Sequence, residues 1–126
     1  MKIQEIVNQL ETVPSLQGKV TVGIPAMMEN LASSPFAWVT SLIEQAGKSP
    51  VSGPVRQLVD LRIEITVGAR NLSDMLEVRN ASTHALLNFQ PDPSYTPMTF
   101  RTGRMEFGDP GWFLWRDEYL TSYYLT

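Results

Sequence analysis

The side chains that most often carry chemistry are scarce in this sequence. The chain has one histidine, His84, and no cysteine. Without cysteine there can be no disulfide, thiol nucleophile or thiolate zinc site. His84 has no sequence neighbour that could serve as its base partner or metal co-ligand, so we interpret it as a surface or boundary residue. The sequence predicts no catalytic residue, no metal site and no cofactor.

Carboxylate pairs can also supply acid–base chemistry, and two carboxylates adjoin near the C-terminus. Asp117 and Glu118 lie in a segment that alternates like a strand, so their side chains should point to opposite faces and cannot act as a close pair. A pairing with Glu106 or Asp109 across a hairpin is the alternative to solvated carboxylates. The glycines form no phosphate-binding turn. We therefore predict that the protein is not an enzyme.

Length and composition are those of one globular domain, which we expect to span residues 1–126. Thirteen acidic and ten basic residues give a net charge of -3, and neither sign forms a run. This charge pattern is not that of a protein that reads nucleic acid or binds anionic lipid. Polar residues interrupt every apolar stretch before a membrane span is reached, so we expect no membrane partner and synthesis as a cytoplasmic protein.

Apolar spacing predicts the elements of the first third of the chain. Residues 2–12 have the period of an amphipathic helix, which Pro14 ends. Residues 19–24 are β-branched and indicate a short strand, and residues 26–32 can add a helical turn. Residues 36–43 are apolar on both faces, as in a strand that is covered on both sides. Alternation assigns Phe36, Trp38 and Leu42 to one face, and Ala37, Val39 and Ile43 to the other.

The clearest periodicity lies in residues 55–67, where apolar and polar residues alternate as in a half-buried strand. At about 3.3 Å per residue this strand would span roughly 43 Å, which is well beyond the usual length. The preceding residues 45–54 are rich in glycine, proline and serine and favour a mobile loop. Residues 36–43, this loop and the strand are predicted to form a long hairpin whose tip projects from the domain. Such an arm suits contact with a neighbour.

The remaining residues predict one helix and two strands. Asn71 or Ser73 can cap a helix that runs to about Phe89. Residues 98–107 indicate a strand with Gly103 as a possible bulge; a tight turn at 108–111 and a last strand over 112–124 follow. The fold class predicted is α+β, with a mixed, largely antiparallel β-sheet, two main α-helices packed on it and the long projecting β-hairpin.

Aromatic residues accumulate in the last strand. Half of the twelve aromatic side chains fall in the final fifteen positions, and alternation places them on both faces, so a one-sided core cannot bury them all. Either some of them face a partner, or Trp112, Phe113 and Trp115 pack in the core with the tyrosines at its rim. Arg62 and Glu64 share one face of the long strand and either pair with a neighbouring strand or subunit or remain solvated. The candidate subunit or partner interface consists of Arg56, Arg62, Glu64, Trp115, Asp117, Tyr119, Tyr123 and Tyr124.

Three segments resemble small bacteriophage tail terminator proteins, which are also described as tail completion proteins. Val67–Asp74 is similar to the strand end that leads into the second helix of that family. Trp115–Tyr124 is similar to its aromatic and acidic C-terminal strand, and Gln45–Pro54 with the following Val-Arg-Gln matches a loop in place and character. The resemblance covers most of the chain.

The resemblance implies a structural protein of the virion, in the phage tail or neck, that assembles in the host cytoplasm. It implies a homohexameric ring on the head-proximal end of the tail tube, which stops further addition of tube protein. Its partners would be further copies of itself, the tail tube protein, a neck or head completion protein and, in a contractile tail, the sheath protein. The genome would pass through the ring without sequence recognition. The functional residues of such a protein are surfaces and not a catalytic set.

Two other functions are compatible with the sequence. One is a head–tail connector or minor tail protein of similar size, which adjacent genes would help to separate from a terminator. The other, from a different class, is a small-ligand-binding or enzyme domain with an apolar pocket lined by Trp38, Trp112 and Trp115. A closed apolar cavity between these three side chains would favour that function, and a solid core there would remove it.

Overall fold

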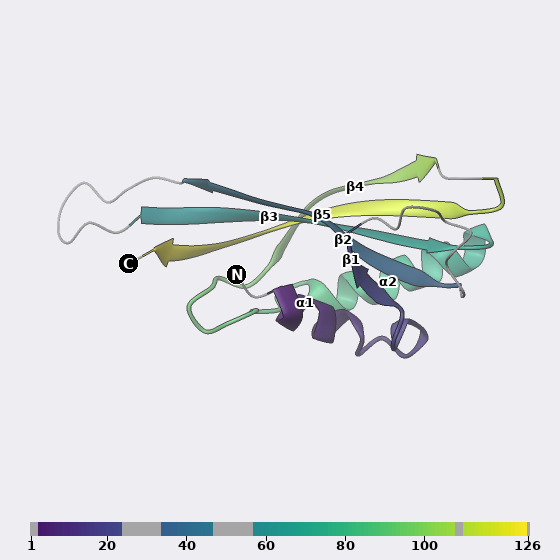
Figure 1. Ribbon diagram of the computed structural model, residues 1–126, viewed down its shortest axis with the longest axis horizontal. Helices are drawn as coiled ribbons and strands as arrows, with labels where there is room; N and C mark the ends of the chain where they lie inside the picture. The colour runs from purple at the N-terminus through teal and green to yellow at the C-terminus, as the bar shows by residue number, and fades with distance from the viewer. Residues whose placement is uncertain (1–2, 24–33, 47–56, 108–109, 126) are drawn as a thin grey trace.

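The computed structural model describes residues 3–23, 34–46, 57–107 and 110–125. The described part has an α+β fold in which helices lie on one side of a β-sheet (Figure 1). The sheet has five strands in the order β1-β2-β3-β5-β4. Only β1 runs parallel to its neighbour, so the predicted mixed, largely antiparallel sheet is confirmed. In chain order the elements are α1 (Ile3–Leu10), the 3₁₀ turn η1 (Pro14–Leu16), β1 (Val20–Val22), β2 (Phe36–Ala46), β3 (Gln57–Ala69), α2 (Leu72–Leu86), β4 (Thr99–Phe107) and β5 (Phe113–Leu125).

Both helices form where the sequence predicts them, and they pack side by side. The predicted cap of the second helix is confirmed at Asn71, whose side-chain oxygen accepts a hydrogen bond of 2.8 Å from the backbone N–H of Asp74. The side-chain amide of Gln9 on α1 donates to the carbonyl of Ala85 on α2 at 2.8 Å. We call the face of the sheet beneath the helices the helix side, and the opposite face the open face. The main core lies on the helix side and includes Ile6, Leu10, Leu61, Ile63, Ile65, Val78, Leu86 and Tyr119, all at most 2% exposed.

Residues 36–39 of β2 are covered on both sides, as predicted, but the second half of the strand is partly exposed and faces differently from the prediction. A register shift between Val39 and Ser41 changes which residues of β2 oppose β3. Because side chains alternate with a period of two, an irregularity of this kind turns every later residue to the other face. Leu42 therefore packs against the main core, and Ile43 is 39% exposed.

The long alternating strand is confirmed as β3, which has β2 and β5 as its neighbours. Strands β2 and β3 pair antiparallel from Phe36 opposite Gly68 to Ala46 opposite Val59, so β2 extends into the segment predicted to be a loop. The rest of that loop and the interface candidate Arg56 lie outside the described residues, as does the helical turn predicted at 26–32. The projecting tip of the hairpin stays a prediction.

The bulge expected at Gly103 lies two to three residues earlier in β4. The register shift falls between Phe100 and Thr102, whereas Gly103 is paired regularly with Asp117 on β5. The glycine is needed there for space. A Cβ atom at Gly103 would lie 2.2 Å from the Oδ1 of Asp117 and 2.9 Å from the indole nitrogen of Trp115.

Candidate partner-binding surface

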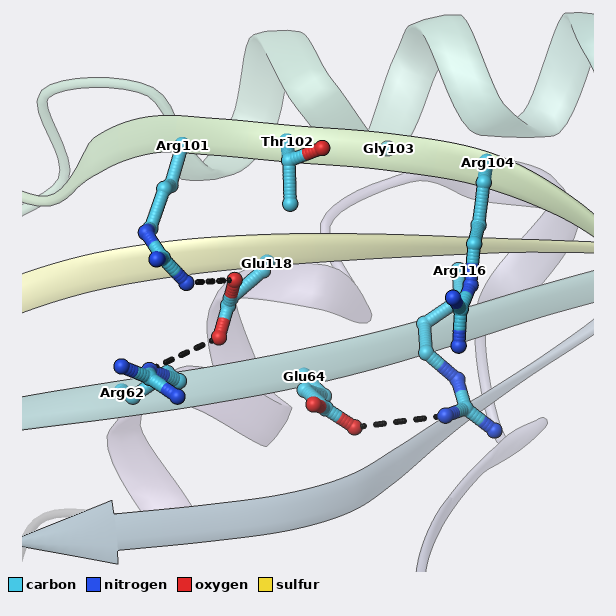
Figure 2. Close-up of a pocket in the computed structure, with 8 residues that line it drawn as sticks. All are labelled: Arg62, Glu64, Arg101, Thr102, Gly103, Arg104, Arg116 and Glu118. Carbon is cyan, nitrogen blue, oxygen red and sulfur yellow. Dashed lines mark hydrogen bonds and ion pairs between the residues drawn. The ribbon is translucent and has the colours of Figure 1, made fainter.

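The open face carries charged side chains that meet across three strands. Glu118 on β5 forms ion pairs with two arginines, Arg62 on β3 and Arg101 on β4 (Figure 2). The Nε of Arg62 lies 2.8 Å from the Oε1 of Glu118. Arg101 lies at the register shift between Phe100 and Thr102, beside the residue that opposes Glu118. The side chain of Glu118 is only 9% exposed, while the side chains of Arg62 and Arg101 are 31% and 48% exposed. A buried carboxylate is thus held between two arginines that water still reaches.

A second set of ion pairs continues along the same face. Glu64 lies directly opposite Glu118 in the register, a placement in which like charges repel each other. Arg116 offsets this repulsion, because its guanidinium lies 3.6 Å from Glu64 and 3.5 Å from Glu106. Arg104 also pairs with Glu106, at 2.8 Å. We call these seven residues the open-face charge cluster: Arg62, Glu64, Arg101, Arg104, Glu106, Arg116 and Glu118.

All members of the open-face charge cluster except Glu106 line a shallow pocket of about 270 Å³. The cluster's four arginines and three glutamates present both donors and acceptors at fixed spacing, which suits complementary polar groups of another protein. A reaction centre would need a nucleophile, a base or a metal, and the part of the chain that the structure describes has no group of three or more His, Cys, Asp or Glu that could hold a metal ion. His84 is exposed on α2, away from this face. The arrangement is chemically that of a binding surface.

An aromatic cluster lies at one end of the open face. Phe36 stacks on Trp38 with ring centroids 4.7 Å apart and meets Trp112 edge to face at 5.2 Å. The guanidinium of Arg70 lies 3.8 Å above the ring of Trp112. Together with Leu114 these aromatic residues form a small buried cluster separate from the main core.

The pocket that the ligand-binding alternative would need between Trp38, Trp112 and Trp115 does not form. Trp38 and Trp112 belong to the aromatic cluster of the open face, but Trp115 packs against the main core on the helix side. Side chains alternate between the two faces along β5, so Trp115 lies on the opposite face of the sheet from Trp38 and Trp112. The ligand-binding alternative that rested on these residues was wrong in its geometry.

On the helix side, the neighbouring residue of Glu118 forms a different kind of ion pair. Asp117 is 2% exposed and accepts two hydrogen bonds from Arg79 of α2, at 3.1 Å from Nε and 3.0 Å from Nη2. The indole N–H of Trp115 also donates to Asp117, at 2.9 Å. Hydrogen bonding to Asp117 raises the pKa of Arg79 above its ordinary value. Asp117 and Glu118 thus point to opposite faces, as predicted.

Tyr119 lies further along the same strand and is fully buried beneath α2. Its hydroxyl is 3.5 Å from that of Thr83, and its ring meets Phe100 edge to face at 5.9 Å. Burial raises the pKa of Tyr119 to about 12, so the phenol is neutral at physiological pH. Tyr123 is half-buried on the same side, stacks on Tyr95 at 4.7 Å and donates to Glu44 at 3.0 Å.

The structure divides the predicted interface residues between the two faces. Arg62, Glu64 and Tyr124 belong to the open face, where Tyr124 is 51% exposed. Trp115, Asp117, Tyr119 and Tyr123 belong to the helix side, and Asp117 and Tyr119 are buried within the subunit. The predicted interface did not include five members of the open-face charge cluster. Only the register of β3, β5 and β4, which the sequence alone does not give, brings them together: Arg101, Arg104, Glu106, Arg116 and Glu118.

The described residues form an α+β fold whose open face carries the charge cluster. The family model for phage tail terminator proteins matches residues 1–126. The chain therefore belongs to the phage tail terminator family and has a structural role in a phage tail. Among solved structures, it is similar in fold to a chain in the virion of a native gene transfer agent particle, with 9% identity and a TM-score of 0.60 over 98% of this chain and 92% of that one. No curated protein matches the sequence. No helix in the described residues is long and apolar enough to cross a membrane.

Proposed function

We propose that this protein is a tail terminator that assembles as a ring, of six copies by analogy with the family, on the head-proximal end of the tail tube. There it stops the addition of tube protein and offers the attachment surface for a neck or head completion protein. The observation that carries this proposal is the family match over residues 1–126. The proposed function is mechanical and has no catalytic step.

The open-face charge cluster supports the proposal as a contact surface for a partner protein. Its arginines are partly exposed and its ion pairs are short-ranged. Carboxylates of a partner protein could therefore replace Glu64 or Glu118 in these ion pairs without a change in the sheet. Arg62, Glu64 and Tyr124 are the proposed contacts on this face. Asp117 and Tyr119 are proposed to act inside the subunit, because their side chains are already enclosed there.

The test is the length of tail tubes assembled in the presence of the protein. The matching tube protein is polymerised alone or with this chain, and tube lengths are measured by electron microscopy. We expect shorter tubes of narrow length distribution, with this chain at one end only. Unchanged tube lengths, with no chain bound at tube ends, would show that the proposed function is wrong.

Two isosteric variants connect this function to the open face. Glu64→Gln removes a charge from the open-face charge cluster, and Glu77→Gln removes one from the exposed surface of α2. We expect the first variant to need several times more protein to limit tube length, and the second to behave as the unchanged chain. Equal effects of both variants would remove the open face as the partner contact.

A further inference from the structure

Three neighbouring residues of the open face each bury a polar atom that has no hydrogen-bond partner among the described residues. These atoms are the indole Nε1 of Trp38 on β2, the hydroxyl of Thr66 on β3 and the Nε of Arg116 on β5. Trp38 and Thr66 are only 4% and 2% exposed. Buried polar groups are nearly always hydrogen-bonded in proteins, and each one left without a partner lowers stability. These three atoms therefore mark a place where an additional group would be stabilising.

The register of the strands places the three residues in one row. Thr66 lies directly opposite Trp38 on one side and directly opposite Arg116 on the other. Residues paired in this way project from the same face of the sheet, and their Cβ atoms are about 4.5–5.5 Å apart. Arg104 on β4 extends the row, because it lies opposite Arg116. We call these four residues the donor row: Trp38, Thr66, Arg104 and Arg116.

The chemistry of the donor row calls for an acceptor that carries negative charge. The N–H groups of Trp38 and Arg116 can only donate, and the hydroxyl of Thr66 can turn its proton toward an acceptor. Arg104 and Arg116 also stand directly opposite each other, where like charges repel. A carboxylate has two acceptor oxygens and forms its strongest hydrogen bonds with guanidinium groups. It is therefore complementary to the row in both hydrogen bonding and charge.

Arg116 is held only loosely inside the subunit. Its guanidinium points toward Glu64 at 3.6 Å (Figure 2) and lies 3.5 Å from Glu106. Both distances are longer than the about 2.7–3.2 Å of a hydrogen bond to nitrogen. Glu106 is engaged more closely by Arg104, at 2.8 Å. Because the side chain of Arg116 is 31% exposed, it can turn toward an outside carboxylate without breaking a short ion pair.

We propose that the donor row binds an aspartate or glutamate side chain that the tube protein brings to the open face. Arg116 turns outward to pair with this carboxylate, and Thr66 and Trp38 donate to it from beneath. Arg104 keeps its own pair with Glu106. This inference rests on the proposed function, because it names the chemical group by which the partner is recognised.

The indole N–H of Trp38 reports on the site in the free protein. Its NMR signal is assigned by its loss in Trp38→Phe and followed as sodium acetate is added, with sodium chloride at equal ionic strength as the control. We expect a saturable downfield shift with acetate alone, because the carboxylate accepts the hydrogen bond that this N–H lacks. The indole N–H of Trp115, which already donates to Asp117, should not move.

Thr66→Val, which removes the hydroxyl, should weaken this binding of acetate several-fold. Equal shifts with the two salts, no shift, or a shift that Thr66→Val leaves unchanged would each overturn the site.

The melting temperature of Thr66→Val separates a carboxylate of a partner from a water held inside the subunit. Removing a buried hydroxyl that has no partner leaves the melting temperature unchanged or raises it, whereas removing one that holds a water lowers it. We expect an unchanged or raised melting temperature together with several times weaker control of tube length. Thr99→Val, at an exposed position on the same face, should change neither. A lowered melting temperature would show that the hydroxyl has a partner within the subunit, and would overturn the proposal.

The two measurements also separate this inference from the proposed function. A shift specific to acetate in a protein that does not limit tube length would keep the carboxylate site and remove the terminator function. A Thr66→Val protein that limits tube length as well as the unchanged chain would keep the function and overturn the inference.

Discussion

Two adjacent carboxylates on β5 show how the two faces of the sheet differ. Asp117 and Glu118 are both buried, at 2% and 7% exposure, and each is paired with arginine. Asp117 is enclosed by its own subunit, beneath α2 and beside an indole N–H. Glu118 is paired with Arg62 and Arg101, whose side chains are themselves partly exposed to water. The two carboxylates are similarly buried, but the ion pair of Asp117 is enclosed beneath α2, whereas the arginines that pair with Glu118 stay partly exposed to water.

The largest difference between the faces is expected when each carboxylate is made neutral. Asp117→Asn should lower the free energy of unfolding by about 2 to 3 kcal/mol, because it leaves the guanidinium of Arg79 partly buried without a counter-charge. Glu118→Gln should cost about 1 kcal/mol or less, since water can solvate both of its arginines. Urea unfolding of the two variants measures this. Equal losses would show that the faces do not differ in this way.

The aromatic cluster is the exception on the open face, and Gly68 tests it. A Cβ atom at Gly68 would lie 2.4 Å from the Cζ of Phe36 and 2.6 Å from the Cδ2 of Leu114. Gly68→Ala should therefore lower the free energy of unfolding by about 2 kcal/mol through overpacking. Adding Phe36→Leu, which shortens the obstructing ring, should cost less than the sum of the two single changes. Strict additivity would mean that the cluster is not tightly packed.

Tyr119 gives the helix side a dependence on pH. Its folded-state pKa of about 12 lies above the ordinary value of 10.0, so the contribution of the neutral phenol is complete below pH 10 and is lost as pH rises toward 12. The loss should reach on the order of 2 kcal/mol near pH 12. Thermal unfolding between pH 9 and 12 should show this decline, and Tyr119→Phe should reduce it. An unchanged decline in Tyr119→Phe would show that another group causes it.

The sequence predicts the helices and strands of both faces, but not the features that depend on the register between strands. The cap at Asn71 and the alternation of β3 follow from local patterns, and both are confirmed. The register shift in β2 has no comparable local signal, so the facing of Leu42 and Ile43 was wrong. The open-face charge cluster joins residues far apart in the chain, and only the strand order brings these residues together.

The smallest expected change in stability belongs to the open face and bears most directly on function. Glu64→Gln weakens a 3.6 Å ion pair with Arg116 but also relieves the repulsion from Glu118, so the free energy of unfolding should change by no more than about 0.5 kcal/mol. The same variant is expected to impair tube-length control, and raised salt should impair the unchanged chain in a similar way, because salt screens exposed charges. A variant that loses stability and tube control in proportion would show that Glu64 holds the subunit together. Loss of tube control at unchanged stability is what a contact with a partner requires.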